Sequence, residues 1–235
     1  MQRTVLTILT LLAFGLVLPS CSSTDPDGSG TVKMNSTLTN SEVNRADDNT
    51  KGADRVEGMP STVTIERVRI LISRLKFKSV SEDTSGGRDI KTGPAIVTFE
   101  NDEVNVVFQE PVPNGTYDRV KLEKHKFSSS EAEQYKDDPT FGEFADPERL
   151  TIIIEGTYND GTEQPFVIQD DATENLWIDF EEDLVIDDDT DATIELSFDA
   201  QQVFKQNNTV LNPFDDKDRR DIFKNLKKAF RLQND

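Results

Sequence analysis

The stretch STVTIERVRILISRLKF, residues 61–77, decides the fold class. Apolar and polar residues alternate through it with two shifts, so that the apolar positions are Val63, Ile65, Val68, Ile70, Ile72, Leu75 and Phe77. A period of two is typical of a strand with one buried face, and each shift fits a bulge or a bend. A helix is the competing interpretation, but the β-branched run Thr62-Val63-Thr64-Ile65 favours a strand. We therefore predict one long strand here.

Shorter strand-like segments follow toward the C-terminus. Turn signals separate them: Asn159-Asp160-Gly161 is typical of a hairpin, and Asn114-Gly115 precedes another strand. The segments are Ala95–Phe99, Glu103–Phe108, Tyr117–Phe127, Leu150–Tyr158, Gln164–Gln169, Leu176–Phe180 and Thr193–Phe198. Many short strands separated by turns predict an all-β domain over residues 61–212, arranged as a β-sandwich.

Two segments break the strand pattern. Residues 128–147 are a polar insertion, with a helical turn expected near Ser130–Tyr135. Residues 213–235 predict an amphipathic helix that Asp215 or Asp216 can cap. Its apolar face holds Ile222, Phe223, Leu226, Ala229 and Phe230, and its basic face holds Lys217, Arg220, Lys224, Lys227, Lys228 and Arg231. We expect the apolar face to pack on the core; docking on a membrane or on a partner protein are the alternatives.

The first 20 residues predict a secretory leader. Arg3 gives a positive start, and residues 5–18 are almost wholly apolar but too few for a spanning helix of about 20 residues. Leu18-Pro19-Ser20-Cys21 resembles the lipobox of bacterial lipoproteins, although Pro19 departs from that pattern. Lipid on Cys21 would anchor the protein stably. We expect a cell-envelope protein of the outer membrane; an ordinary secretory signal with a chance cysteine is the alternative.

Residues 21–60 are rich in Ser, Thr, Asn, Asp and Gly. This composition predicts a flexible tether between the lipidated cysteine and the domain. Within the tether, Gly30–Met34 is a possible first strand.

The charge of the chain limits its partners. Its 235 residues include 26 Lys and Arg against 45 Asp and Glu, a formal net charge of -19. This argues against nucleic acid, whose phosphates need a basic surface, and suits cations, basic partners or simply a well-solvated surface. The only cysteine is Cys21, so the mature domain is expected to hold no disulfide and no cysteine nucleophile.

Several segments together match a family pattern, of which PNGTYDRVKL, residues 113–122, is the most specific. The others are Gly30-Thr31-Val32, Ile65–Ile70, Leu196–Ala200 and Leu211-Asn212-Pro213. In this order they resemble DUF4382, a family of bacterial lipoprotein domains of unknown function, over nearly the whole mature chain. The resemblance implies an immunoglobulin- or transthyretin-like β-sandwich and carries over no catalytic residue. The chain departs from the family after the first strand, in the insertion at 128–147 and in the terminal helix.

Candidates for catalysis are few. His125 is the only histidine, and it lies between Lys124 and Lys126, whose charges disfavour binding of protons and metals. The acids Asp179, Glu181, Glu182 and Asp183 are plentiful but adjacent, and neighbours on a strand alternate faces. We expect no enzyme. A carboxylate-pair hydrolase is kept as the third hypothesis, after the two non-catalytic functions given at the end of this section.

Asp187-Asp188-Asp189-Thr190-Asp191 is the sharper candidate site. Carboxylates at alternating positions, on Asp187, Asp189 and Asp191, are typical of a calcium loop. The segment does not match the EF-hand motif, because Ala192 and Phe198 stand where that motif needs glycine and glutamate. A calcium site at the edge of a sandwich and a solvated acidic turn both stay open. No other cofactor is expected.

These observations predict a lipid-anchored, non-catalytic binding or structural module of the cell envelope, whose partner is the membrane and an envelope protein or glycan. A calcium-stabilised adhesion or glycan-binding domain is the alternative. An exposed aromatic platform would favour glycan binding. Trp177, however, lies in an alternating strand, where we expect it in the core.

Overall fold

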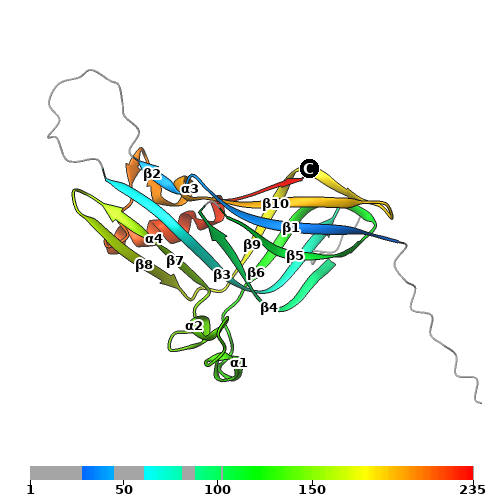
Figure 1. Ribbon diagram of the computed structural model, residues 1–235, viewed down its shortest axis with the longest axis horizontal. Coiled ribbons are helices and arrows are strands. Elements are labelled where there is room, and N and C mark those ends of the chain that lie inside the picture. The colour runs from blue at the N-terminus through cyan, green and yellow to red at the C-terminus, as the bar shows by residue number, and fades with distance from the viewer. Residues whose placement is uncertain (1–27, 45–60, 81–87, 102, 235) are drawn as a thin grey trace, which may run out of the picture.

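The computed structural model describes residues 28–44, 61–80, 88–101 and 103–234 (Figure 1). The predicted leader, Cys21 and much of the predicted tether lie outside these residues, so the structure does not test them. The described chain is mostly β-strand with a few short helices, which confirms the all-β class.

The elements follow one another in this order. The strands are β1 (Ser29–Thr39), β2 (Glu42–Asn44), β3 (Thr62–Ser79), β4 (Arg88–Glu100), β5 (Val104–Pro113), β6 (Gly115–Lys124), β7 (Ile152–Asn159), β8 (Glu163–Asp170), β9 (Glu174–Ile186), β10 (Asp191–Asp199), β11 (Lys205–Gln206), β12 (Thr209–Val210) and β13 (Phe230–Asn234). The helices are α1 (Ser129–Tyr135), α2 (Gly142–Ala145), α3 (Ala200–Phe204), α4 (Asp216–Asn225) and the 3-10 turn η1 (Leu226–Lys228).

The long strand β3 organises the sheet, as residues 61–77 predict. It pairs with β2 and β4 along one edge and with β7 and β6 along the other. Its register shifts between Ile65 and Arg67 and again between Ile72 and Arg74. These irregularities are the predicted bulges, and they keep the apolar side chains on the buried face although the sequence alternation changes phase.

The strands other than β11 and β12 form one mixed sheet, with the order β5-β1-β10-β13-β9-β6-β3-β7-β8. The sheet curls, so that β4 and β5 contact each other (Figure 1). Phe99 of β4 meets Phe198 of β10 across the core, with ring centroids 5.6 Å apart. Helices α3 and α4 close the core beneath β7 and β8, where Phe166 contacts Phe204. One large apolar core results.

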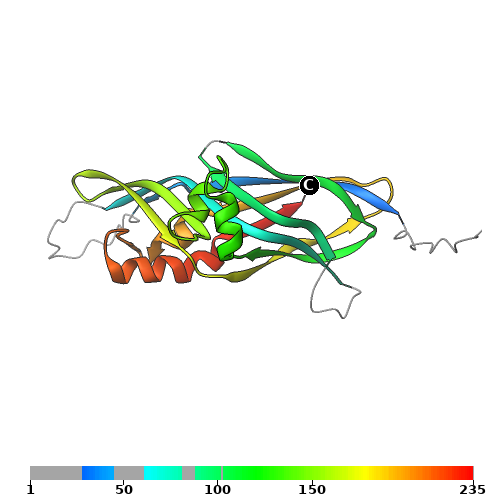
Figure 2. The ribbon, with the colours of Figure 1, turned by 90° about the horizontal axis from the view of Figure 1, so that it is seen from below.

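A second, smaller core lies on the outer face of the sheet. Leu71 and Ile153 point away from the main core, yet both are buried. The insertion at 128–147 covers them with Phe144, and Figure 2 shows α1 and α2 over this part of the sheet. The predicted helical turn is α1, whose N-cap Ser128 forms a capping box with Glu131.

Two predictions about the ends of the domain need correction. The possible first strand at Gly30–Met34 is part of β1, but the tether does not extend through residue 44, because β1 pairs in parallel with β10 and antiparallel with β5, and β2 pairs with β3. The C-terminal helix does not reach Leu232, because α4 ends at Asn225 and the chain returns as β13 between β10 and β9. The residues of its apolar face are nevertheless buried or packed against the core, as expected.

Candidate functional site

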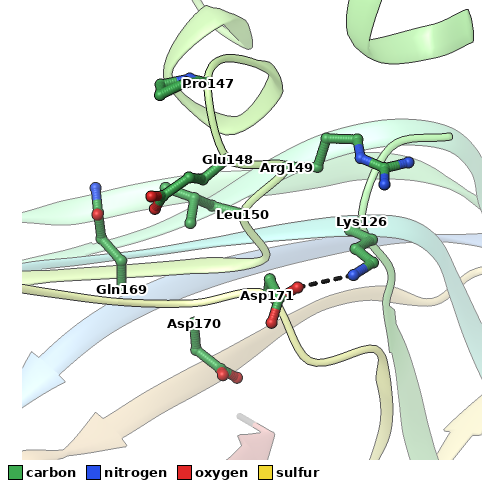
Figure 3. A pocket seen from close by; sticks show the side chains of 8 residues that line it. All are labelled: Lys126, Pro147, Glu148, Arg149, Leu150, Gln169, Asp170 and Asp171. Carbon is green, nitrogen blue, oxygen red and sulfur yellow. Dashed lines mark hydrogen bonds and ion pairs between the residues drawn. The ribbon is translucent and has the colours of Figure 1, made fainter. Parts of the chain in front are cut away.

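A groove runs beside the second half of β8, at residues 167–170. This strand ends the sheet order, and within the described chain no other strand pairs with its outer edge. Two hollows of about 390 and 490 Å³ adjoin here, because both are lined by Glu148 and Gln169. The first also holds Lys126, Arg149, Asp170 and Asp171 (Figure 3). The second also holds Val167, Arg219, Arg220 and Phe223, the last three from α4.

A buried ion pair fixes one end of the groove. Lys124, the last residue of β6, has a side chain only 3% exposed, and its Nζ lies 3.2 Å from Oδ2 of Asp170 at the end of β8. The Thr151 hydroxyl donates to the carbonyl oxygen of Asp170 at 3.1 Å. A buried ammonium group is tolerated only when a carboxylate compensates its lost hydration. The pair therefore joins β6 to β8 beneath the first hollow.

One acid of the first hollow, Asp171, is held as a carboxylate. Lys126 donates to Asp171 at 2.8 Å, and this hydrogen bond lowers the pKa of the Asp171 carboxyl (Figure 3). Asp170 accepts a hydrogen bond from Lys124 at 3.2 Å. A hydrolase of the carboxylate-pair type needs one acid whose pKa is raised, so that it can donate a proton. The surroundings of Asp171 favour the opposite state.

Three charged groups of the groove are open to a ligand. Arg149 donates to the carbonyl of Phe127 and to the Ser129 hydroxyl, both at 3.3 Å. Arg149, Arg220 and the exposed Glu148 form no ion pair with any described residue. Two guanidinium groups that form no ion pair with a described carboxylate, set along one groove, can bind carboxylates of a partner.

Sequence reasoning missed this groove. Lys126 and Arg149 flank the polar insertion at 128–147, and Arg220 lies on the basic face of the predicted helix, so no sequence motif connects the three. One signal was available: Pro165 lies within β8, and proline inside a sheet is largely confined to edge strands.

Trp177 lies on the outer face of β9, so its expected place in the core is wrong. Its side chain is among the exposed large hydrophobic ones, at 39% exposure. It stands opposite Lys121 of β6, whose Nζ lies 5.4 Å from the ring centroid, and Arg119 lies over the ring at 5.9 Å. The predicted alternation of this strand is confirmed, because Leu176 and Ile178 are buried. The indole of Trp177 lies between them on the opposite, solvent-facing side of the strand.

In the acidic turn between β9 and β10, carboxylate oxygens already accept hydrogen bonds from other groups of the protein. Oδ1 of Asp187 accepts from the Thr190 hydroxyl at 2.6 Å and from the amide of Asp189 at 3.2 Å. Asp188 accepts from the Asn114 side chain at 2.7 Å, and Asp191 begins β10. Among the described residues no group of three or more such side chains is placed to hold a metal ion. Calcium binding stays a prediction.

The remaining candidates are separate. His125 is exposed just after β6. The hydrogen bonds from Ser128 lower the pKa of Glu131, and the nearby imidazole of His125 adds a smaller effect in the same direction. Asp179, Glu181, Glu182 and Asp183 are all exposed, and Asp179 lies 3.4 Å from Arg119.

No family model, no curated protein and no solved structure matches this chain. The resemblance to the DUF4382 family therefore stays a prediction. In the part of the chain that the structure describes, no helix is long and apolar enough to cross a membrane.

Proposed function

We propose that this protein is a lipid-anchored, non-catalytic binding module of the bacterial cell envelope, at the outer membrane. The leader and the lipobox-like ending at Cys21 support the anchor. The groove along β8 supports the binding function. The ion-paired carboxylates of that groove favour binding over proton transfer, so the carboxylate-pair hydrolase remains the weaker hypothesis.

The open edge of β8 is the observation that carries the proposal. An unpaired strand edge offers backbone donors and acceptors, to which an extended segment of another protein can add as a further strand. Val167, 57% exposed, and Phe223 offer apolar contacts beside that edge. Arg149 and Arg220 offer charge-assisted hydrogen bonds to carboxylates. The partner is therefore an extended segment of an envelope protein that carries acidic residues.

The finer fold is also a proposal. We propose that the curled sheet is a variant of the immunoglobulin- or transthyretin-like sandwich. Aromatic contacts between distant strands support it: Phe77 of β3 packs on Phe108 of β5 at 6.0 Å, as two facing layers would.

Photocrosslinking in cells tests the binding function. A photoreactive residue replaces Val167 in one strain and Val185 in another; both valines are exposed, at 57% and 62%, but only Val167 lines the groove. We expect an adduct from position 167 alone, with an acidic segment of an envelope protein identified by mass spectrometry.

A charge reversal shows whether the adduct reflects binding in the groove. Arg220→Glu should abolish the adduct, because it removes a groove cation. Lys217→Glu, on the same helix but outside the groove lining, should leave it intact. Equal adducts from positions 167 and 185, or an adduct that survives Arg220→Glu, would contradict the proposal.

A further inference from the structure

A notch opens where β9 and β13 diverge. Their ladder contains a single described residue pair, Phe180 with Leu232. Beyond that pair the chain leads away into η1, and a hollow of about 250 Å³ remains, lined by Asn175, Leu176, Trp177, Ile178, Lys227 and Phe230. This hollow shares no lining residue with the groove along β8.

The side chains around the notch combine an aromatic ring with hydrogen-bonding groups. In the sheet order β9 lies between β6 and β13. The cations of Lys121 and Arg119 come from β6, whereas Lys227 and Phe230 come from η1 and β13. The indole of Trp177 is therefore supported by cations on one side and borders the notch on the other. Those cations hold the ring in place, as cation–π contacts do.

The polar groups of the notch point to a hydroxylated ligand. The exposed Asn175 offers an amide, which both donates and accepts. Lys227 forms an ion pair with Glu174, so an ammonium group and a carboxylate stand side by side at the rim. Such mixed donors and acceptors suit hydroxyl groups. A charged ligand, in contrast, would be repelled by the partner of the ion pair whose charge has the same sign.

We propose that this notch binds the ring of a neutral saccharide, which stacks on Trp177 and is hydrogen-bonded by Asn175 and Lys227. A pyranose presents an apolar face of C–H groups and a rim of hydroxyls, which is the combination that the notch provides. Lys227, Lys121 and Arg119 are each ion-paired with an acid of this chain, so little free charge remains at the notch to attract an acidic glycan, which favours a neutral one. This site is independent of the groove along β8 and of the lipid anchor.

The single tryptophan makes the site directly observable, because Trp177 is the only one in the chain. The full chain is purified in a detergent without a sugar head group and titrated with cellohexaose, maltohexaose, chitohexaose and, as the acidic probe, alginate oligomers. We expect a saturable change in the emission of Trp177 with at least one neutral probe and none with alginate. No saturable change with any neutral probe up to about 10 mM would overturn the proposal, as would binding of alginate alone.

Variants then assign the binding to the notch. Calorimetry with the neutral probe should show affinity weakened about tenfold or more by Trp177→Ala, the effect expected of an aromatic anchor, and weakened also by Lys227→Ala. Val185→Ala, an exposed position on the same strand, should bind like the original chain. Since Trp177 and Lys227 are exposed, unfolding curves of the variants should match that of the original chain. Undiminished affinity in folded Trp177→Ala would overturn the proposal.

Discussion

The residue that most constrains the groove is Lys124, because its ammonium group is almost fully buried against Asp170. Asp170→Asn removes the compensating charge but leaves the lysine in place. We expect it to lower the free energy of unfolding by about 3 kcal/mol, since an unpaired buried charge is costly. Lys124→Met removes the charge that needs compensation and should cost distinctly less.

Denaturant unfolding of the two variants measures these free energies. Asp171→Asn is the matched control, since its partner Lys126 is 36% exposed and its own side chain 64% exposed. It should change stability by less than about 1 kcal/mol, as expected of a surface pair. A smaller loss in Asp170→Asn than in Lys124→Met would show that the pair is not the linkage we describe.

A second ion pair makes stability depend on pH. The hydrogen bond from Arg67, at 2.5 Å, lowers the pKa of the Glu155 carboxyl. A lowered pKa contributes stability that is present above the ordinary glutamate pKa of about 4.3 and is lost as pH falls through the lowered value. Because the side chain of Arg67 is 41% exposed, solvent screening limits this contribution to about 1 kcal/mol.

Glu155→Gln should therefore flatten the acid side of the stability curve below about pH 4.3 and lower stability at neutral pH. Thermal unfolding between about pH 3 and pH 7 measures it, a range that spans that pKa. Glu133→Gln, which removes an exposed partner of Lys136, should leave the pH profile unchanged. A Glu155→Gln profile parallel to that of the original chain would refute the assignment.

At the scale of elements, the alternation of apolar and polar residues predicts those strands in which nearly every buried position holds an apolar side chain. β3, β7 and β10 carry a buried side chain at nearly every second position, so the pattern alone identifies them. β1 does not show this pattern in full, because Gly30 and Ser36 occupy two of its buried positions. Its place in the sheet comes from pairing with β10, more than 150 residues away, which no local pattern encodes.

The C-terminal segment shows how a helical period conceals a strand. A helical period places Phe230 on one face with Ile222 and Leu226, yet Phe230 and Leu232 also alternate as in a strand. Both are buried in the main core. The sheet position between β10 and β9 stabilises the strand, and a sequence pattern cannot show that this position is vacant. The same reason hid the groove and the notch, since both depend on where strands end or diverge.

Leu232→Ala tests this arrangement. Leu232 is fully buried between two strands, so its truncation should lower the free energy of unfolding by about 2–5 kcal/mol. Gln233→Ala, at the neighbouring exposed position, should change stability by less than about 0.5 kcal/mol. Denaturant unfolding distinguishes them. Equal effects would mean that the chain end is not inserted in the sheet.

At the scale of the whole molecule, the start of the first strand predicts which end would face the membrane if Cys21 carries lipid. β1 begins at Ser29, so only seven residues, 22–28, separate it from Cys21. They reach about 25 Å when fully extended. Gly28 lies beside Asp188 and Asn114, so the acidic turn marks this end, whereas the turn between β7 and β8 lies at the opposite end (Figure 1). If Cys21 carries lipid, the acidic turn is the part nearest the head groups.

Fluorophores on introduced thiols test this orientation, because a lipidated Cys21 leaves no other free thiol in the chain. Asp189→Cys labels the acidic turn and Thr162→Cys labels the turn between β7 and β8. On vesicles with quenchers in their head groups, we expect strong quenching at position 189 and little at position 162. Adding Cys21→Ser should release the protein and abolish quenching at both positions, since no acyl chain remains. Equal quenching at the two positions in the anchored protein would show that the domain lies flat on the vesicle and that the acidic turn is not its membrane-facing end.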